Sequence, residues 1–169
     1  MHLTVFLGIV FIGFSLSQAG AQNKTVPLTQ GVYNTGASLV EEAQDASLDI
    51  HFHPCQDNEK RYCASILKIH EPNGSSGQTM LPNGEQIIGF QFIRGLKPVG
   101  NGEYRRGRIV AVDESIAEGE MREYGFRLKQ NEDGTITARG CLGAWCPRVM
   151  TWTPAPKAKA PETSDAGDI

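Results

Sequence analysis

The stretch ARGCLGAWCPRVMTWTP, residues 138–154, closes the part of the chain that has the pattern of ordered structure. It places Cys141 and Cys146 on either side of the four residues LGAW, and it continues into an alternating segment that contains Trp152. Alternation of this kind is typical of a β-strand that packs on one side. We therefore expect a last hairpin whose two cysteines form a disulfide and fix the register of the final strand.

Short runs of strand-like pattern also precede this hairpin, from residue 29 onward. In SLDIHFHP, residues 47–54, Leu48, Ile50 and Phe52 alternate with polar residues. The segment NEDG contains an Asp-Gly pair, which favours a tight hairpin turn. About eight such runs predict an all-β domain, a single eight-stranded antiparallel up-and-down barrel, because closure removes exposed sheet edges. An immunoglobulin-like sandwich is the alternative, although the Cys–Trp–Cys spacing is lacking.

Two connections between the predicted strands are longer than a hairpin turn. The segment GASLVEEAQDA, residues 36–46, has apolar residues at helical spacing and forms either a helix or a wide loop. The segment EPNGSSGQTMLPNGE, residues 71–85, is dense in glycine and proline. Such composition predicts a long mobile loop at one end of the barrel.

The two ends of the sequence predict an exported chain with a flexible tail. Residues 1–21 form an apolar run followed by the small-residue string Ala-Gly-Ala, which is typical of a cleaved signal peptide. An uncleaved membrane anchor is the alternative, but the run is short for a bilayer span. We expect a flexible segment at 22–28, a barrel domain at 29–153, a disordered tail at 154–169, and localisation to the periplasm or the medium.

The four cysteines lie in the predicted mature chain, where an oxidising compartment favours disulfides. Their spacing suggests two local pairs, Cys55 with Cys63 and Cys141 with Cys146, but four cysteines allow three connectivities. A zinc site is the rival interpretation, and it lacks the usual C-x2-C spacing.

Composition excludes several classes of function. The formal net charge is −3, so no basic field indicates a nucleic-acid partner. No nucleophile–base arrangement or pair of carboxylates stands out, and we predict no catalytic residue and no cofactor. His51 and His53 lie two apart and could chelate a metal, but no third ligand is evident, so we predict no metal site. We expect a monomer.

Several stretches resemble a known bacterial family. IIGFQFIRGLK, then G-x-Y-R-R-G-R-I, then GTITARGCLGAWCPRVMTWTP are similar to the second half of the family called domain of unknown function 2147, and HPCQDNEKRYCASI resembles its first cysteine hairpin. The similarity covers residues 31–153, with Tyr33 and Tyr104 where the family usually has tryptophan, and with a longer segment at 110–124. The resemblance implies a small exported lipocalin-like β-barrel without an established activity.

Arginines are the candidate ligand-binding groups. The alternation in YRRGRI predicts Tyr104, Arg106 and Arg108 on one strand face and Ile109 with Arg105 on the other. A guanidinium inside an apolar barrel would offer a fork for a carboxylate or a phosphate. The alternative is that the arginines lie outside and pair with glutamates, as exposed arginines usually do.

These observations define a candidate site and three hypotheses for function. We expect Trp152 to close one end of the barrel against Tyr33, because barrel closure brings the first and last strands together. The candidate ligand-binding residues are Tyr33, Tyr104, Arg106, Arg139 and Trp152. The first hypothesis is a non-enzymatic envelope protein that binds a small apolar or anionic amphipathic ligand. The second is an isomerase-like enzyme acting inside the barrel, and the third is an interaction module that uses the 71–85 loop.

Overall fold

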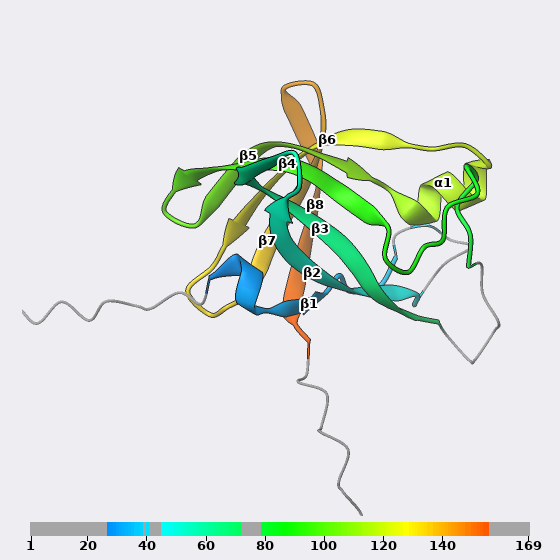
Figure 1. Ribbon diagram of the computed structural model, residues 1–169, viewed down its shortest axis with the longest axis horizontal. Helices are drawn as coiled ribbons and strands as arrows, with labels where there is room; N and C mark the ends of the chain where they lie inside the picture. The colour runs from blue at the N-terminus through cyan, green and yellow to red at the C-terminus, as the bar shows by residue number, and fades with distance from the viewer. Residues whose placement is uncertain (1–26, 39, 41–44, 72–78, 156–169) are drawn as a thin grey trace, which may run out of the picture.

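The chain folds as a closed antiparallel barrel (Figure 1). The computed structural model describes residues 27–38, 40, 45–71 and 79–155. Within these residues the strands follow one another around the barrel in chain order, β1 to β8, and every pairing is antiparallel. The barrel closes where Tyr33 pairs with Pro154 and Asn34 with Thr153. The predicted eight-stranded up-and-down barrel is confirmed.

The elements have the following bounds. A 3-10 helix, η1, precedes the barrel, and one α-helix, α1, connects β5 to β6. The bounds are η1 Leu28–Gln30, β1 Val32–Asn34, β2 Ser47–Cys55, β3 Asn58–His70, β4 Gln91–Gly100, β5 Glu103–Val110, α1 Val112–Glu118, β6 Glu123–Gln130, β7 Ile136–Leu142 and β8 Trp145–Pro154.

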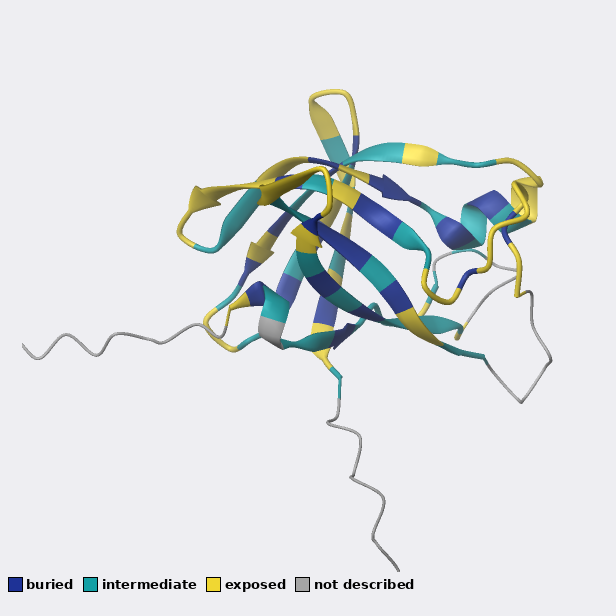
Figure 2. Cartoon of the chain, viewed as in Figure 1, coloured by how far each residue is buried: buried dark blue, intermediate teal, exposed yellow. Residues whose placement is uncertain are grey.

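The core lies inside the barrel, on alternate residues of each strand (Figure 2). In β2, Ile50 and Phe52 are fully buried, whereas the intervening His51 and His53 are half-buried on the outer face. This is the face assignment that the alternation in residues 47–54 predicted.

The face assignment predicted for residues 104–109 is wrong because β5 contains a bulge. The pairing of β5 with β6 shifts register between Tyr104 and Gly107, and Arg106 has a φ of 62°. A bulge inserts an unpaired residue, and each one-residue shift moves the residues that follow to the opposite face. Tyr104 and Ile109 consequently both contribute to the core, whereas Arg106 is exposed.

Both predicted disulfides are present, and the four cysteines leave no free thiol. Cys55 and Cys63 join β2 to β3, and Cys141 and Cys146 join β7 to β8 across the last turn. The local pairing is therefore confirmed, and it leaves no cysteine for a zinc site.

The helix lies in a different connection from the one predicted. Residues 39 and 41–44 of the candidate segment are outside the described residues, and residues 36–38 are not helical. The described helix is α1, which has Asp113 and Glu114 in its first turn and ends at Gly119 with φ 70°. Carboxylates near a helix N-terminus and glycine at its end are both stabilising. A helix of about two turns is too short to give a clear period in the sequence.

Several sequence-based predictions fall outside the described residues. These are the signal peptide, most of the flexible segment at 22–28, the disordered tail beyond residue 155, and residues 72–78 of the long loop.

Candidate ligand-binding cavity

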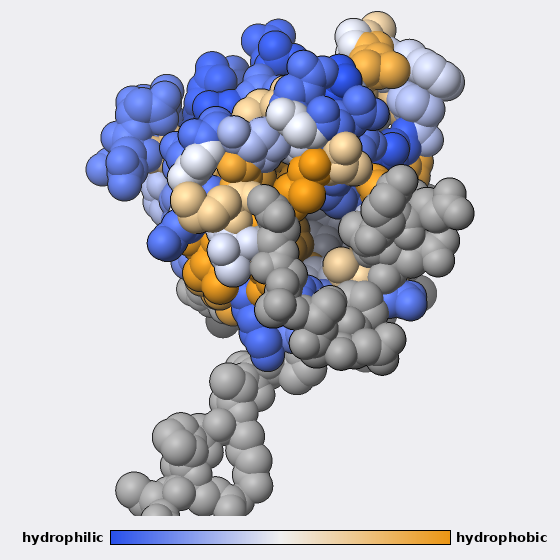
Figure 3. Space-filling view, turned by 90° about the vertical axis from the view of Figure 1, so that its right-hand side faces the viewer, coloured by the Kyte–Doolittle hydropathy of each residue, from blue (hydrophilic) through white to orange (hydrophobic). Residues whose placement is uncertain are grey.

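One end of the barrel contains a partly open cavity of about 350 Å³. It lies where the β1–β2, β3–β4 and β5–β6 connections meet, under α1, and Figure 3 looks onto this end of the molecule. Cavities that bind small molecules have volumes of about 300–1,000 Å³ and mostly apolar walls. The apolar walls here are formed by Leu48, Ile69, Ile87, Phe92, Ile109, Val110, Val112, Ile116, Met150 and Trp152.

The barrel below this cavity is filled by aromatic side chains. The ring of Trp152 stacks on Phe126 with 5.6 Å between centroids, and Phe52 lies 6.4 Å from Trp152 and 5.9 Å from Tyr33. Trp152 is 1% exposed. Since it also lines the cavity, Trp152 marks the boundary between the hollow half and the packed half of the barrel.

A glycine contributes to the free space. Gly140 lines the cavity on β7, and a Cβ atom built there would have Arg148 Cβ as its nearest neighbour, at 3.6 Å. This is an ordinary van der Waals distance, so the position can accept a side chain. The volume next to Gly140 is therefore open because no side chain occupies it.

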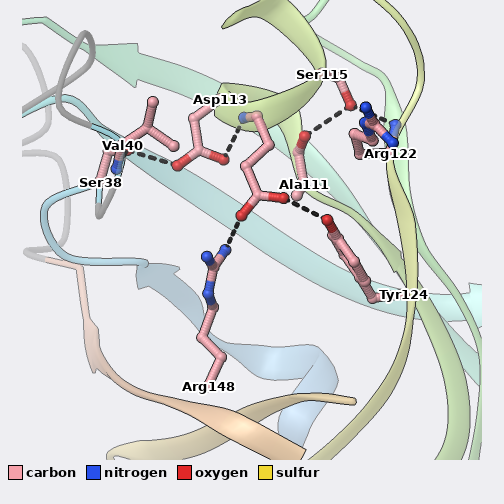
Figure 4. A network of polar contacts seen from close by, with 9 residues as sticks. Ser38, Val40, Ala111, Asp113, Ser115, Arg122, Tyr124 and Arg148 are labelled. Atoms are coloured by element: carbon pink, nitrogen blue, oxygen red, sulfur yellow. Dashed lines mark hydrogen bonds and ion pairs between the residues drawn. The ribbon is translucent and has the colours of Figure 1, made fainter. Parts of the chain in front are cut away.

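The polar groups of the cavity centre on Glu114 of α1 (Figure 4). Arg148 of β8 donates a hydrogen bond to Glu114 Oε1, and the Tyr124 hydroxyl of β6 donates to Glu114 Oε2 at 2.6 Å. This hydrogen bond to Glu114, together with burial, raises the pKa of Tyr124 above its ordinary value of 10.0. Both carboxylate oxygens thus have partners, and the positive charge of Arg148 is balanced.

Further hydrogen bonds anchor α1 to the barrel. Ser38 Oγ donates to Asp113 Oδ2 at 2.5 Å, which ties the β1–β2 connection to the helix. Ser115 is fully buried, and its hydroxyl donates to Ala111 O at 2.7 Å and accepts from Arg122 N at 2.9 Å. These contacts hold α1 over the end of the barrel, with Glu114 positioned above the apolar walls.

The charges around the cavity are mainly negative. Glu71 and Asp113 line it and Glu114 lies beside it, whereas Arg148 is the basic residue among the described lining residues. An anionic group that entered would have to compete with Glu114 for Arg148. The surrounding carboxylates would also repel it.

The structure separates the residues that the sequence predicted to form one site. Of these, only Trp152 lines the cavity among the described residues. Tyr33 and Tyr104 lie in the packed half, where burial raises the pKa of both hydroxyls. Arg106 and Arg139 are exposed on the outside of the barrel.

Sequence reasoning missed the residues that supply the polar end of the cavity. Arg148 shares the inner face of β8 with Met150 and Trp152, and that alternation was visible in the sequence. Glu114 and Tyr124 were not identifiable, because their positions depend on the short helix and on the pairing of β5 with β6.

The two histidines on the outer face of β2 have protein partners. His51 Nε2 lies 3.1 Å from Thr29 O, and His53 Nε2 lies 2.9 Å from Ser65 Oγ. Among the described residues there is no group of three or more His, Cys, Asp or Glu side chains that could hold a metal ion. In the same part of the chain, no helix is long and apolar enough to cross a membrane.

The fold and the cavity define a lipocalin-like β-barrel. The model of the family domain of unknown function 2147, described as uncharacterized protein conserved in bacteria, matches residues 39–154, and the chain belongs to this family. Among solved structures, the chain is similar to protein HP1028 from the human pathogen Helicobacter pylori, which belongs to the lipocalin family. The TM-score is 0.60 at 20% identity, covering 79% of this chain and 86% of that one. No curated protein matches the sequence.

Proposed function

We propose that the protein is an exported, non-enzymatic carrier or receptor that holds one small molecule in the cavity under α1. The ligand is mostly apolar, and its polar end carries no negative charge, as in an alcohol or an amide. The observation that supports this most is an apolar cavity of about 350 Å³ whose arginine is already paired with Glu114.

The choice of polar end follows from the pairing of Arg148. The sequence-based expectation of an anionic ligand requires an inward arginine that is free to bind it. Beside the cavity, Glu114 already pairs with Arg148, so an entering anion must compete with a charge-assisted pair that is already formed. A hydroxyl or amide can instead hydrogen-bond to Glu114 or to the Tyr124 hydroxyl without breaking the ion pair.

The apolar walls supply the affinity. About 0.8 kcal/mol is gained for each methylene removed from water, and losses of rotational and translational freedom oppose this gain. A chain of about ten carbons is therefore expected to bind with a micromolar or weaker dissociation constant.

Two observations support export. The apolar N-terminal run with its Ala-Gly-Ala string has the pattern of a signal peptide. The two disulfides are stable in oxidising compartments and rare in the cytosol.

The polar groups of the cavity do not favour the enzymatic alternative. A barrel enzyme would need an inward group whose pKa lies near the working pH. The hydrogen bond to Glu114 moves the pKa of Tyr124 upward, away from neutrality, which makes its proton harder to transfer.

Calorimetric titration with 1-decanol and with decanoate tests the proposal. We expect saturable binding of one decanol per chain and at least about ten-fold weaker binding of decanoate, because the carboxylate must compete with Glu114. Tighter binding of decanoate, or no binding of either compound, would contradict the proposal.

Two substitutions examine the role of the ion pair. Glu114→Gln keeps an acceptor for Tyr124 but removes the competing charge, so we expect decanoate affinity to rise towards that of decanol. Adding Arg148→Met should abolish this gain while leaving decanol binding within about two-fold, since the alcohol does not use the guanidinium.

A further inference from the structure

The turn between β7 and β8 exposes large apolar side chains. Leu142 and Trp145 lie opposite each other at this hairpin tip and are 59% and 68% exposed. The disulfide Cys141–Cys146 closes the hairpin directly behind them. The tip, residues 142–145, is coloured as exposed at the top of Figure 2 and contains no charged residue. Two large apolar side chains that are exposed side by side on a cross-linked hairpin indicate a contact surface.

A row of arginines crosses the outside of the same sheet. Arg127 of β6 lies directly opposite Arg139 of β7. The bulge of β5, which holds Arg105 and Arg106, occupies the position opposite Arg127, because Tyr104 pairs with Leu128 and Gly107 with Phe126. Like charges placed directly opposite each other destabilise a sheet unless an anion balances them.

Three of these arginines lack an acidic partner. Arg105 pairs with Glu103 at 2.7 Å, whereas Arg106, Arg127 and Arg139 form no ion pair with any described residue. The Nε of Arg127 is buried and has no hydrogen-bond partner there. We define Arg106, Arg127 and Arg139 as the arginine row.

The backbone at Arg106 adds a separate argument. Its φ of 62° lies in the left-handed region, where glycine would be free of strain. Strained non-glycine residues are found mainly where a side chain is needed for function. A long cation at this position supports a role that depends on its charge.

The hairpin tip and the arginine row are close together. Arg139 lies opposite Val149, which is 50% exposed, and it precedes Leu142 by three residues on β7. At about 3.3 Å per residue, this places the tip about 10 Å from the row along the strands. An apolar tip beside unpaired cations is complementary to a partner with an apolar interior and a negatively charged surface layer.

We propose that the hairpin tip and the arginine row dock the protein onto an anionic phospholipid bilayer. Trp145 and Leu142 enter the interfacial region, where tryptophan is favoured, and the arginines bind lipid phosphates. The core of a protein–protein interface is depleted of charged residues, whereas this tip is flanked by unbalanced positive charge. The β7–β8 turn lies at the same end of the barrel as α1, so docking turns the cavity end towards the membrane.

The test is sedimentation with vesicles of phosphatidylglycerol or of phosphatidylcholine. We expect binding to phosphatidylglycerol that weakens as salt is raised, and much weaker binding to phosphatidylcholine. Each of Arg106→Gln, Arg127→Gln and Arg139→Gln should weaken binding about five-fold. Trp145→Ser should weaken it about ten-fold or more.

Matched variants separate docking from general effects. Lys60→Gln removes an exposed positive charge from the β2–β3 hairpin, and Leu67→Ser removes a 48% exposed leucine from β3. Both should leave vesicle binding within about two-fold. All variants carry the same N-terminal residues, so any contribution of that segment to binding is common to them.

Tryptophan fluorescence reports insertion directly. The chain has two tryptophans, and Trp152 is buried, so a blue shift on adding phosphatidylglycerol vesicles should be lost in Trp145→Phe. Absence of binding to phosphatidylglycerol would overturn the proposal, as would binding that the arginine and Trp145 variants leave unchanged. Formation of a dimer that requires Trp145 would assign the tip to a second copy of the chain and also overturn it.

Discussion

The two halves of the barrel are built from the same alternating strands but are filled differently. In the packed half, Trp152 contacts both Phe52 and Phe126, and all three rings belong to the buried core. In the hollow half, at the α1 end, Gly140 and half-buried Met150 line open volume. The packed half supplies stability and fixes the barrel, and the hollow half is the part that can bind.

The two halves also treat polar groups differently. In the packed half, Gln130 of β6 is buried and donates to the hydroxyl of Tyr33 on β1 at 3.3 Å, a contact across the filled core. In the hollow half, Glu114, Tyr124 and Arg148 come from three different elements and meet at the cavity. Polar groups assembled from several elements around open space are typical of binding sites.

Truncation of an aromatic residue should give the largest effect on stability. Phe52→Ala removes a fully buried ring from the packed half and should lower the free energy of unfolding by about 3–5 kcal/mol. Met150→Ala, in the wall of the hollow half, should cost at most about 2 kcal/mol, because space already exists beside it. Urea denaturation of both variants measures the difference, and equal losses would mean that the halves are packed alike.

Removal of either disulfide should have the next largest effect. Replacing Cys55 and Cys63, or Cys141 and Cys146, by serine should cost about 2–3 kcal/mol in each case, with the larger loss for the longer loop of the first pair. Only loss of the second pair should also weaken decanol binding, because Gly140 and Arg148 flank it in the cavity wall. Calorimetric titration of both double variants with 1-decanol measures this difference. If both variants weaken decanol binding equally, the result would argue against a cavity at the α1 end.

Two glycines provide a smaller but more local comparison. A Cβ on Gly107 would lie 2.8 Å from Leu96 Cγ, so Gly107→Ala should destabilise the fold by about 1–3 kcal/mol. Gly140→Ala meets no such contact and should stabilise it by about 0.5–1 kcal/mol. Thermal unfolding of the two variants measures the direction of each change in stability. A loss of stability in Gly140→Ala would show that the volume beside this residue is not free.

Alkaline titration should give the smallest effect. The pKa values of Tyr33, Tyr104 and Tyr124 are raised above 10.0, so their contribution to stability is complete below pH 10.0 and is lost as the pH rises through the folded-state values. Burial is the main cause of the raised pKa of Tyr33 and Tyr104, whereas the hydrogen bond to Glu114 is the main cause for Tyr124. Glu114→Ala should therefore lower the pKa of Tyr124 alone. Ultraviolet difference spectra record the ionisation of the tyrosines as the pH is raised. If Glu114→Ala leaves the titration curve unchanged, the Tyr124–Glu114 contact is contradicted.

The barrel could be predicted from the sequence because its determinants are local. The alternation of Ile50 and Phe52 and the Asp-Gly turn before β7 act within single hairpins. The cysteine pairs are also local, at separations of 8 and 5 residues. Each of these features is decided by near neighbours in the chain, so the pattern alone is informative.

The candidate site could be predicted only in part because it depends on register and on contacts between distant segments. The bulge at Arg106 leaves Tyr104 against the core and turns Arg106 and Arg108 outward, and no sequence pattern marked it. Ser38 and Asp113, which join the helix to the β1–β2 connection, are 75 residues apart. Trp152 was expected to close one end of the barrel against Tyr33. It is buried on β8, but its ring partners are Phe52 and Phe126, and Phe52 is the ring next to Tyr33.

The proposed ligand-binding cavity above Trp152 can be tested through the fluorescence of that residue. In Trp145→Phe, Trp152 is the remaining tryptophan, and titration with 1-decanol should change its emission and saturate at one equivalent. Adding Gly140→Val should reduce the change, because the added side chain occupies part of the cavity, whereas Thr151→Val on the exposed outer face should leave it intact. An emission that decanol does not change, or that changes equally with Gly140→Val, would contradict the proposal.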